Sequence, residues 1–202
     1  KLELKVASTR TQILSALDNE YTNVAAAGMI ASLDRASRYK YSLPYMQATP
    51  VVVYRYGSTR PRSIKDIIGK RIAVVSDSYH IDELDTLKLK TPELQWNALD
   101  VETIDLMKMV QDKEIDYAII TSAELDIHQA FYPRVKLGFN IGDVQKVAWY
   151  FPKSTDQTLI GRANQFFARI EEDGNLLNLK ERYFGHLEQL NYVGARTFIK
   201  HI

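Results

Sequence analysis

The feature that most constrains the fold is a regular alternation of short β-type and α-type segments between residues 64 and 139. Runs of five or six mostly apolar, often β-branched residues predict buried strands. The runs between them carry apolar residues at helical spacing and predict helices. The predicted strands are 71–75, 94–99, 115–120 and 135–139, and the predicted helices are 64–68, 81–87, 102–111 and 123–131. This alternation is typical of a mainly parallel sheet flanked by helices, so we predict an α/β fold.

The segments on either side of this centre are less regular. They predict strands at 2–7, 24–29, 50–54 and 147–151, and helices or helical turns at 13–17, 34–39, 159–170 and 176–184. In the third of these helices one apolar face is expected to hold Leu159, Ala163, Phe166, Phe167 and Ile170.

A turn-rich stretch, YGSTRPRS at residues 56–63, separates the first part of the chain from the regular centre. We therefore expect two lobes joined by two crossing segments, near 54–58 and near 140–147. Residues 58–141 are expected to form one lobe. Residues 1–55 and 146–202 are expected to form the other lobe together.

Composition and motifs argue against several classes of function. The 202 residues include 26 basic and 25 acidic ones, and the formal net charge is +1. This balance argues against a nucleic-acid partner and against membrane contact by this segment. The chain has no cysteine and no dinucleotide or phosphate-loop motif. His80, His128, His186 and His201 lack metal-site spacing, so we expect no metal. No acid–base pair is evident in the sequence, so we expect no catalysis, and we expect no cofactor.

The segment from residue 25 to 45 is the richest in candidate ligand-binding groups. Gly28 permits close approach of the backbone to a ligand, and Ser32 offers a hydroxyl. Arg35 offers a planar fork that matches a carboxylate. The alternative is that Arg35 is a surface arginine with an ordinary ion pair.

Two further candidates stand where a predicted strand ends and a helix begins. At residues 76–79, free backbone N–H groups at the helix start would attract an anion. Thr121 and Ser122 lie at the strand edge where α/β proteins bind ligands. The alternative at both places is simple capping, by Asp77 or Ser78 in the first and by Thr121 with Glu124 in the second.

Three segments resemble, in order, motifs of the family 3 extracellular solute-binding proteins: AAGMIASLDRASRYKYSLPY (26–45), DIIGKRIAVVSDSYH (66–80) and EIDYAIIT (114–121). The resemblance implies a two-lobed type II periplasmic-binding-protein fold with a ligand in the interlobe cleft. It also implies that Arg35 holds a ligand carboxylate. The groups implied to surround that ligand are the main chain of Gly28 and Met29, Ser32, and the backbone N–H groups of Ser78 and Tyr79.

Two positions depart from the motifs of that family. Asp77 stands in place of the usual glycine, and Thr121 stands in place of the aspartate that grips the α-ammonium of a free amino acid. A hydroxyl cannot neutralise an ammonium in a closed cleft. We therefore expect a peptide-like carboxylate ligand in preference to a free amino acid.

Within the family, YRYGSTRPRSIKDIIGKRIAV, VAWYFPK and KERYFGHLEQLNYVGARTFIKHI resemble the regulatory domain of the membrane-bound lytic murein transglycosylase F proteins. This resemblance implies a periplasmic domain that senses a cell-wall peptide or muropeptide. It also implies a C-terminal transglycosylase domain beyond residue 202, attachment of the parent to the outer membrane, and a first lobe lacking its first strand and helix.

Three other readings remain open at this point. The first is a stand-alone periplasmic receptor that delivers an amino acid or small polar solute to an ABC transporter. The second is an enzyme on the same scaffold, such as a cyclohexadienyl dehydratase. The third is an interaction module whose cleft binds nothing.

Overall fold

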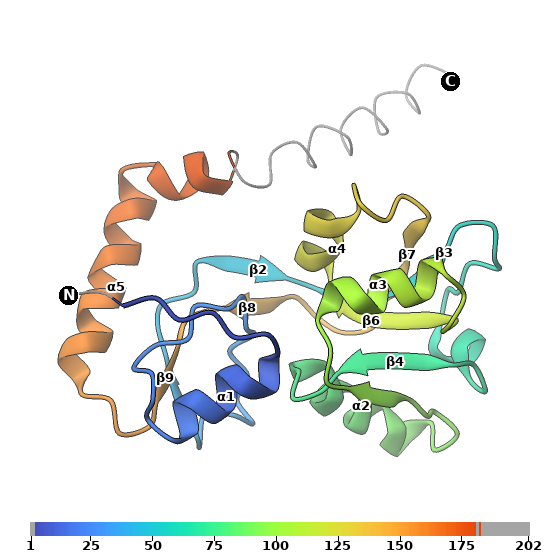
Figure 1. Cartoon of the computed structure of the whole chain (residues 1–202), viewed down its shortest axis with the longest axis horizontal. Helices are drawn as coiled ribbons and strands as arrows, with labels where there is room; N and C mark the ends of the chain where they lie inside the picture. The colour runs from blue at the N-terminus through green and yellow to red at the C-terminus, as the bar shows by residue number, and fades with distance from the viewer. Residues whose placement is uncertain (1–2, 181, 183–202) are drawn as a thin grey trace.

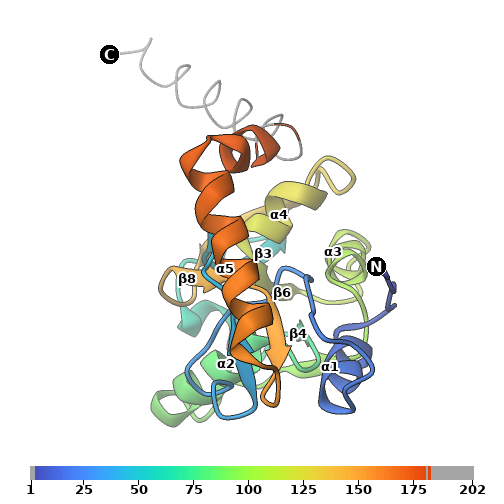
Figure 2. The same cartoon turned by 90° about the vertical axis from the view of Figure 1, so that its left-hand side faces the viewer.

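The computed structural model describes residues 3–180 and 182, which form two α/β lobes lying side by side (Figures 1 and 2). The first lobe contains α1 (Arg10–Asp18), β1 (Tyr39–Tyr41), β2 (Met46–Ala48), β8 (Gln145–Val147), β9 (Tyr150–Pro152) and α5 (Gln157–Glu172). Its strands form antiparallel pairs, β1 with β9 and β2 with β8. Figure 2 shows α5 running along the outer side of this lobe.

The second lobe is built on a five-stranded sheet in the order β5-β4-β6-β3-β7. Its elements are β3 (Pro50–Arg55), the 3-10 helix η1 (Ile64–Ile67), β4 (Ile72–Val75), α2 (Tyr79–Lys90), β5 (Asn97–Leu99), α3 (Thr103–Gln111), β6 (Tyr117–Thr121), α4 (Ser122–His128) and β7 (Val135–Asn140). Strand β4 pairs in parallel with β5 and β6, whereas β3 is antiparallel to β6 and β7. The predicted α/β alternation is therefore confirmed, with one antiparallel strand inserted in the sheet.

Strand β3 is buried on both of its faces, which explains its unbroken apolar sequence. Val51 and Val53 pack with Leu106 of α3 on one side of the sheet. Val52 faces the other side and packs with Leu84 of α2. Helices on both faces thus enclose two layers of core around the same strand.

The chain crosses between the lobes twice, and each crossing continues a paired strand. Residue 49 joins β2 to β3, and residues 141–144 join β7 to β8. The second crossing lies where the sequence predicts it. The first crossing, at residue 49, differs from the prediction of 54–58. The apolar strand 50–55 is buried on both faces inside the second lobe, so the chain crosses before this strand and not after it. The turn-rich stretch 56–63 instead follows the far end of β3 and does not cross.

Several predictions for the first lobe are wrong. Residues 3–7 form no strand, and Leu4 and Val6 are 84% and 100% exposed, because the alternating pattern there finds no partner strand among the residues that the structure describes. Residues 24–29 make only an isolated bridge, from Ala25 to Tyr150. Residues 33–38 form hydrogen-bonded turns and no helix. The predicted strand 147–151 is divided between β8 and β9.

Helix α5 carries the strongest amphipathic pattern of the first lobe. Its buried residues are Ile160, Ala163, Phe167 and Ile170. Leu159 and Phe166, also predicted to be buried, are each 37% exposed. Residues 175–180 are helical, and the rest of the predicted helix, apart from residue 182, lies outside the described residues. No helix in residues 3–180 and 182 is long and apolar enough to cross a membrane.

Two leucines of α2 provide a test of this packing. Leu84 is fully buried against β4, whereas Leu89 is 85% exposed. We expect Leu84→Ala to lower the free energy of unfolding by about 2–5 kcal/mol, because it leaves a cavity in the core. Leu89→Ala is the matched control and should change it by less than about 0.5 kcal/mol. Urea unfolding followed by circular dichroism measures both, and equal effects would contradict the assignment of the buried face.

Candidate functional site

Arg35 extends from the first lobe to the start of α2 in the second lobe. Its guanidinium donates hydrogen bonds to the backbone oxygens of Asp77, at 2.6 Å, and of Ser78, at 3.0 Å. Its Nε lies 3.3 Å from Oδ2 of Asp82. The Arg35 side chain is only 17% exposed. Arg35 is therefore a residue of the lobe interface and not a solvated surface arginine.

A second ion pair between the lobes joins Arg10 of α1 to Glu124 of α4, with 3.3 Å between Nη2 and Oε1. Thr103 donates to the same carboxylate oxygen at 2.8 Å. The other oxygen, Oε2, accepts from the backbone N–H and the hydroxyl of Thr121, at 2.7 and 2.8 Å. Both charged side chains are less than one-fifth exposed. The carboxylate of Glu124 is thus already neutralised and fully hydrogen-bonded.

Thr121 and Ser78 both cap helices, but in different ways. Thr121 is the N-cap of α4, where its hydroxyl accepts from the backbone N–H of Glu124 and completes a capping box. The capping interpretation is confirmed there. Ser78 is the N-cap of α2, and its side chain makes no capping hydrogen bond. Asp77 has φ of 55°, the left-handed region that a glycine would occupy at least cost.

Buried polar atoms without partners gather at the lobe interface. In the described part of the chain, those atoms are Arg10 Nε, Thr11 Oγ1, Ser32 Oγ, Ser78 Oγ, His80 Nδ1 and Gln111 Oε1. All but the last belong to the start of α1, to the segment before Arg35, or to the start of α2, and Figure 1 shows the start of α1 facing the second lobe. A buried polar group without a partner costs about 1–3 kcal/mol. This concentration indicates a place where a ligand or ordered water supplies the missing hydrogen bonds.

The remaining predicted site residues divide between the interface and the first-lobe core. The ring of Tyr79 packs, as does Tyr45, against a small apolar cluster shared by both lobes, and its hydroxyl donates to Glu83 at 2.7 Å. Met29 is buried in the first-lobe core, and its carbonyl accepts from the N–H of Ala148. Gly28 has φ of 66° and is exposed, with open space where a side chain would stand.

Sequence reasoning missed Arg10. It gave Glu124 a capping role and named Glu124 or Asp126 as the carboxylate that could neutralise a ligand ammonium. The one local signal for Arg10 is its place in the first turn of α1, where the helix dipole disfavours a cation. In residues 3–180 and 182, no group of three or more histidine and carboxylate side chains is placed to hold a metal ion.

Burial controls the protonation of the two central titratable groups. Burial lowers the pKa of His80 from 6.5 to about 4, so the imidazole is neutral near pH 7. Burial alone would raise the pKa of Glu124, but the guanidinium of Arg10 and the hydrogen bonds from Thr121 and Thr103 oppose it, and the net pKa is lowered. The interface therefore contains a paired carboxylate and guanidinium, with a neutral buried imidazole nearby.

We expect the protein to lose stability as the pH falls from about 6.5 towards 4. In this range the unfolded chain binds a proton at residue 80 that the folded chain does not bind, so protonation favours unfolding by up to about 3 kcal/mol. Burial also lowers the pKa of His128, so the comparison uses His128→Gln alone against His80→Gln/His128→Gln. Urea unfolding at several pH values should show a flatter curve for the double variant. Identical dependence of the free energy of unfolding on pH in the two variants would contradict a neutral, buried His80.

Proteins of known family and structure that are similar to this chain share its fold. Residues 1–186 match the family described as bacterial extracellular solute-binding proteins, family 3. A mutant of ArgBP from T. maritima is similar in structure, with a TM-score of 0.80, 22% identity, and coverage of 91% of this chain and 79% of that one. A histidine kinase sensor domain with similarity to periplasmic binding proteins has a TM-score of 0.73 and 16% identity, and covers 88% of this chain and 76% of that one.

Two curated relatives are similar over the whole chain, and both are named membrane-bound lytic murein transglycosylase F. The one from Hahella chejuensis is 37% identical over 206 residues, and the one from Pseudomonas putida strain F1 is 38% identical over 204 residues. The chain spans 40% and 42% of their lengths. The two-lobed α/β structure and the match over residues 1–186 show that this chain belongs to the bacterial extracellular solute-binding proteins, family 3.

Proposed function

We propose that this chain is a non-catalytic ligand-sensing domain that binds a carboxylate-bearing solute between its lobes. The observation that carries the proposal is the position of Arg35, whose guanidinium spans the lobe interface beside the unpartnered hydroxyls of Ser32 and Ser78. An arginine fork matches a carboxylate with two parallel hydrogen bonds. The unpartnered hydroxyls supply further donors around it.

Binding of such a ligand would exchange one set of contacts for another. Without ligand, Arg35 is satisfied by two backbone carbonyls and by Asp82. A ligand carboxylate would take over the guanidinium and accept from N–H groups in the first turn of α2. The N–H of Ser78, also predicted to hold the ligand, already donates to the backbone oxygen of Val75 at 3.3 Å. The first lobe would then hold the second through the ligand, because Arg35 comes from one lobe and α2 from the other.

The preferred ligand is proposed to be a peptide or muropeptide with a free carboxylate. The carboxylate that contacts Thr121 is that of Glu124, and it is already paired with Arg10. A ligand ammonium would have to compete with Arg10 for Glu124, and burying it unpaired is costly. A peptide amide N–H at this place needs only a neutral acceptor such as a hydroxyl or a carbonyl.

The relatives suggest the setting of this domain. Since the chain spans about two-fifths of proteins named membrane-bound lytic murein transglycosylase F, we propose that it belongs to a longer periplasmic protein of this kind. In that protein a C-terminal transglycosylase domain would carry the catalysis, and the parent would be attached to the outer membrane. A peptidoglycan stem peptide is then the natural ligand for a domain that senses the state of the cell wall.

Replacement of Arg35 tests the carboxylate anchor. We expect Arg35→Ala to weaken binding of a peptidoglycan stem tripeptide by about 2–5 kcal/mol, or roughly thirty-fold to several thousand-fold, because a charge-assisted pair is lost. Arg35→Lys should recover only part of the lost affinity, since an ammonium lacks the planar fork of a guanidinium. Arg38→Ala is the matched control, because Arg38 pairs with Asp18 in its own lobe. Calorimetric titration that finds equal affinity for Arg35→Ala and the wild type would refute the anchor.

A comparison of ligands tests the preference for peptides. We expect a stem tripeptide or tetrapeptide to bind at least about tenfold more tightly than alanine, glutamate, glutamine or lysine, because an unpaired buried ammonium is costly. Thr121→Asp should shift the preference towards free amino acids by adding a carboxylate beside Glu124. Thr121→Ser keeps both cap and hydroxyl and should leave the preference unchanged. Tight calorimetric binding of one amino acid, with none of the peptides, would show that the ligand class is wrong.

A further inference from the structure

Basic side chains line two adjoining cavities at the end of the second lobe that is remote from the lobe crossing. The cavities have volumes of about 400 and 560 Å³, and both are lined by Arg55 and Lys113. Seven basic and three acidic side chains line them in total, although the whole chain has a formal net charge of only +1. The basic cluster comprises Arg55, Arg60, Arg62, Lys70, Arg71, Lys113 and Arg134.

The three acidic side chains of these cavities are already engaged. Asp112 is paired with Lys108 of α3 at 2.7 Å. Asp66 accepts hydrogen bonds from the backbone N–H groups of residues 62 and 63 and so caps the start of η1. Asp116 is paired with Arg71 at 2.8 Å. The rest of the basic cluster therefore faces the cavities without a dedicated carboxylate.

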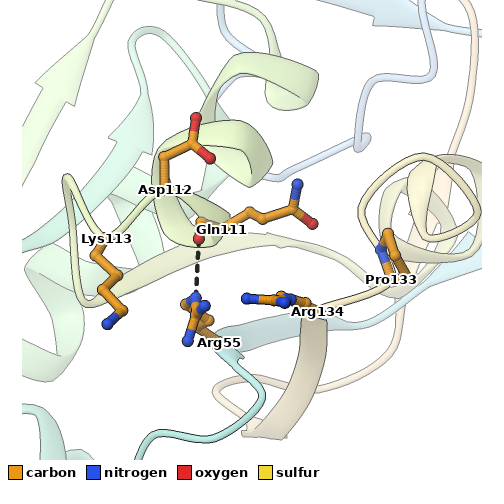
Figure 3. Close-up of a pocket in the computed structure, with 6 residues that line it drawn as sticks. All are labelled: Arg55, Gln111, Asp112, Lys113, Pro133 and Arg134. Carbon is orange, nitrogen blue, oxygen red and sulfur yellow. Dashed lines mark hydrogen bonds between the residues drawn. The ribbon is translucent and has the colours of Figure 1, made fainter.

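The smaller cavity is lined by two guanidinium groups, those of Arg55 and Arg134. Figure 3 shows the side chain of Arg134 extending toward that of Arg55, while the carboxylate of Asp112 points away from both. Arg55 donates only to backbone oxygens, of Gln111 at 2.9 Å and of Tyr56 at 3.4 Å. Two guanidinium groups that line one cavity repel each other, and an anion between them would relieve this repulsion. The pair is therefore a preformed place for a negative group.

The backbone conformation and the position of Lys113 also favour an anion site at these cavities. It has φ of 66°, the left-handed conformation that follows many helices and that favours glycine. A lysine in this position costs conformational energy that a glycine would avoid. It also places an ammonium at the rim shared by the two cavities.

We propose that this basic cluster binds a phosphate-bearing ligand. A carboxylate is satisfied by one arginine fork, whereas a phosphate group has more acceptor oxygens and charge and suits two guanidinium groups and an ammonium together. The two cavities have room for more than one phosphate. The ligand is either a soluble phosphate compound or the phosphate of a lipid headgroup. The proposal is independent of the function proposed for the lobe interface, because none of the seven basic residues is part of that site.

Calorimetric titration with inorganic pyrophosphate tests the site. We expect saturable binding that weakens as salt is added, since salt screens exposed charges. Lys113→Gly/Arg134→Ala should weaken it about tenfold or more, because two charge-assisted contacts are lost. The glycine suits the left-handed backbone, so this variant is expected to fold normally. Arg134→Glu, a change at an exposed position, provides a second variant and should also weaken binding.

Lys90→Ala/Arg162→Ala is the matched control, because it removes the same charge from two exposed positions outside the cavities. We expect it to bind pyrophosphate like the wild type. Sedimentation with phosphatidylglycerol vesicles, against phosphatidylcholine vesicles, distinguishes a lipid headgroup from a soluble phosphate. Equal losses in both double variants would mean that only overall charge matters and would overturn the proposal. Absence of binding to both pyrophosphate and phosphatidylglycerol would overturn it as well.

Discussion

The hydrogen bonding of strand β3 is the constraint on which the rest of the structure depends. This strand pairs with β6 and β7 in the centre of the second lobe, and through residue 49 it continues into β2 of the first lobe. Strand β7 returns through residues 141–144 into β8, which pairs with β2. The two lobes are thus joined by two neighbouring strands, and a change in their relative position requires bending only at these two short segments.

Beyond these crossings, the lobes meet through polar groups as well as through one small apolar cluster. Arg35 with Asp82 and Arg10 with Glu124 bridge the interface, and His80 lies buried nearby. Buried ion pairs contribute little net stability, because desolvation offsets their attraction. Such an interface can exchange its internal partners for those of a ligand at modest cost. This property is what a domain that binds and releases a solute needs.

The sequence predicted the second lobe better than the first for a physical reason. Strands 72–75 and 117–121 are buried on both faces, so their composition alone identifies them. The stretch 2–7 has the alternation of a strand, but residues 3–7 have no partner strand in residues 3–180 and 182. Arg35 was identified as a binding candidate from its residue type and motif. Arg10 was missed, because its partner Glu124 lies 114 residues away in the chain.

The sequence by itself determined the α/β class, the absence of thiol chemistry and the residue types at the lobe interface, including a hydroxyl at Thr121. Only the tertiary structure decided that β3 belongs to the second lobe and that the carboxylate of Glu124 meets Arg10. It alone gathered basic residues from positions 55 to 134 around two cavities in a chain of nearly neutral charge. Periodicity and propensity act over a few residues, whereas strand pairing and the meeting of charges depend on segments that are distant in the chain.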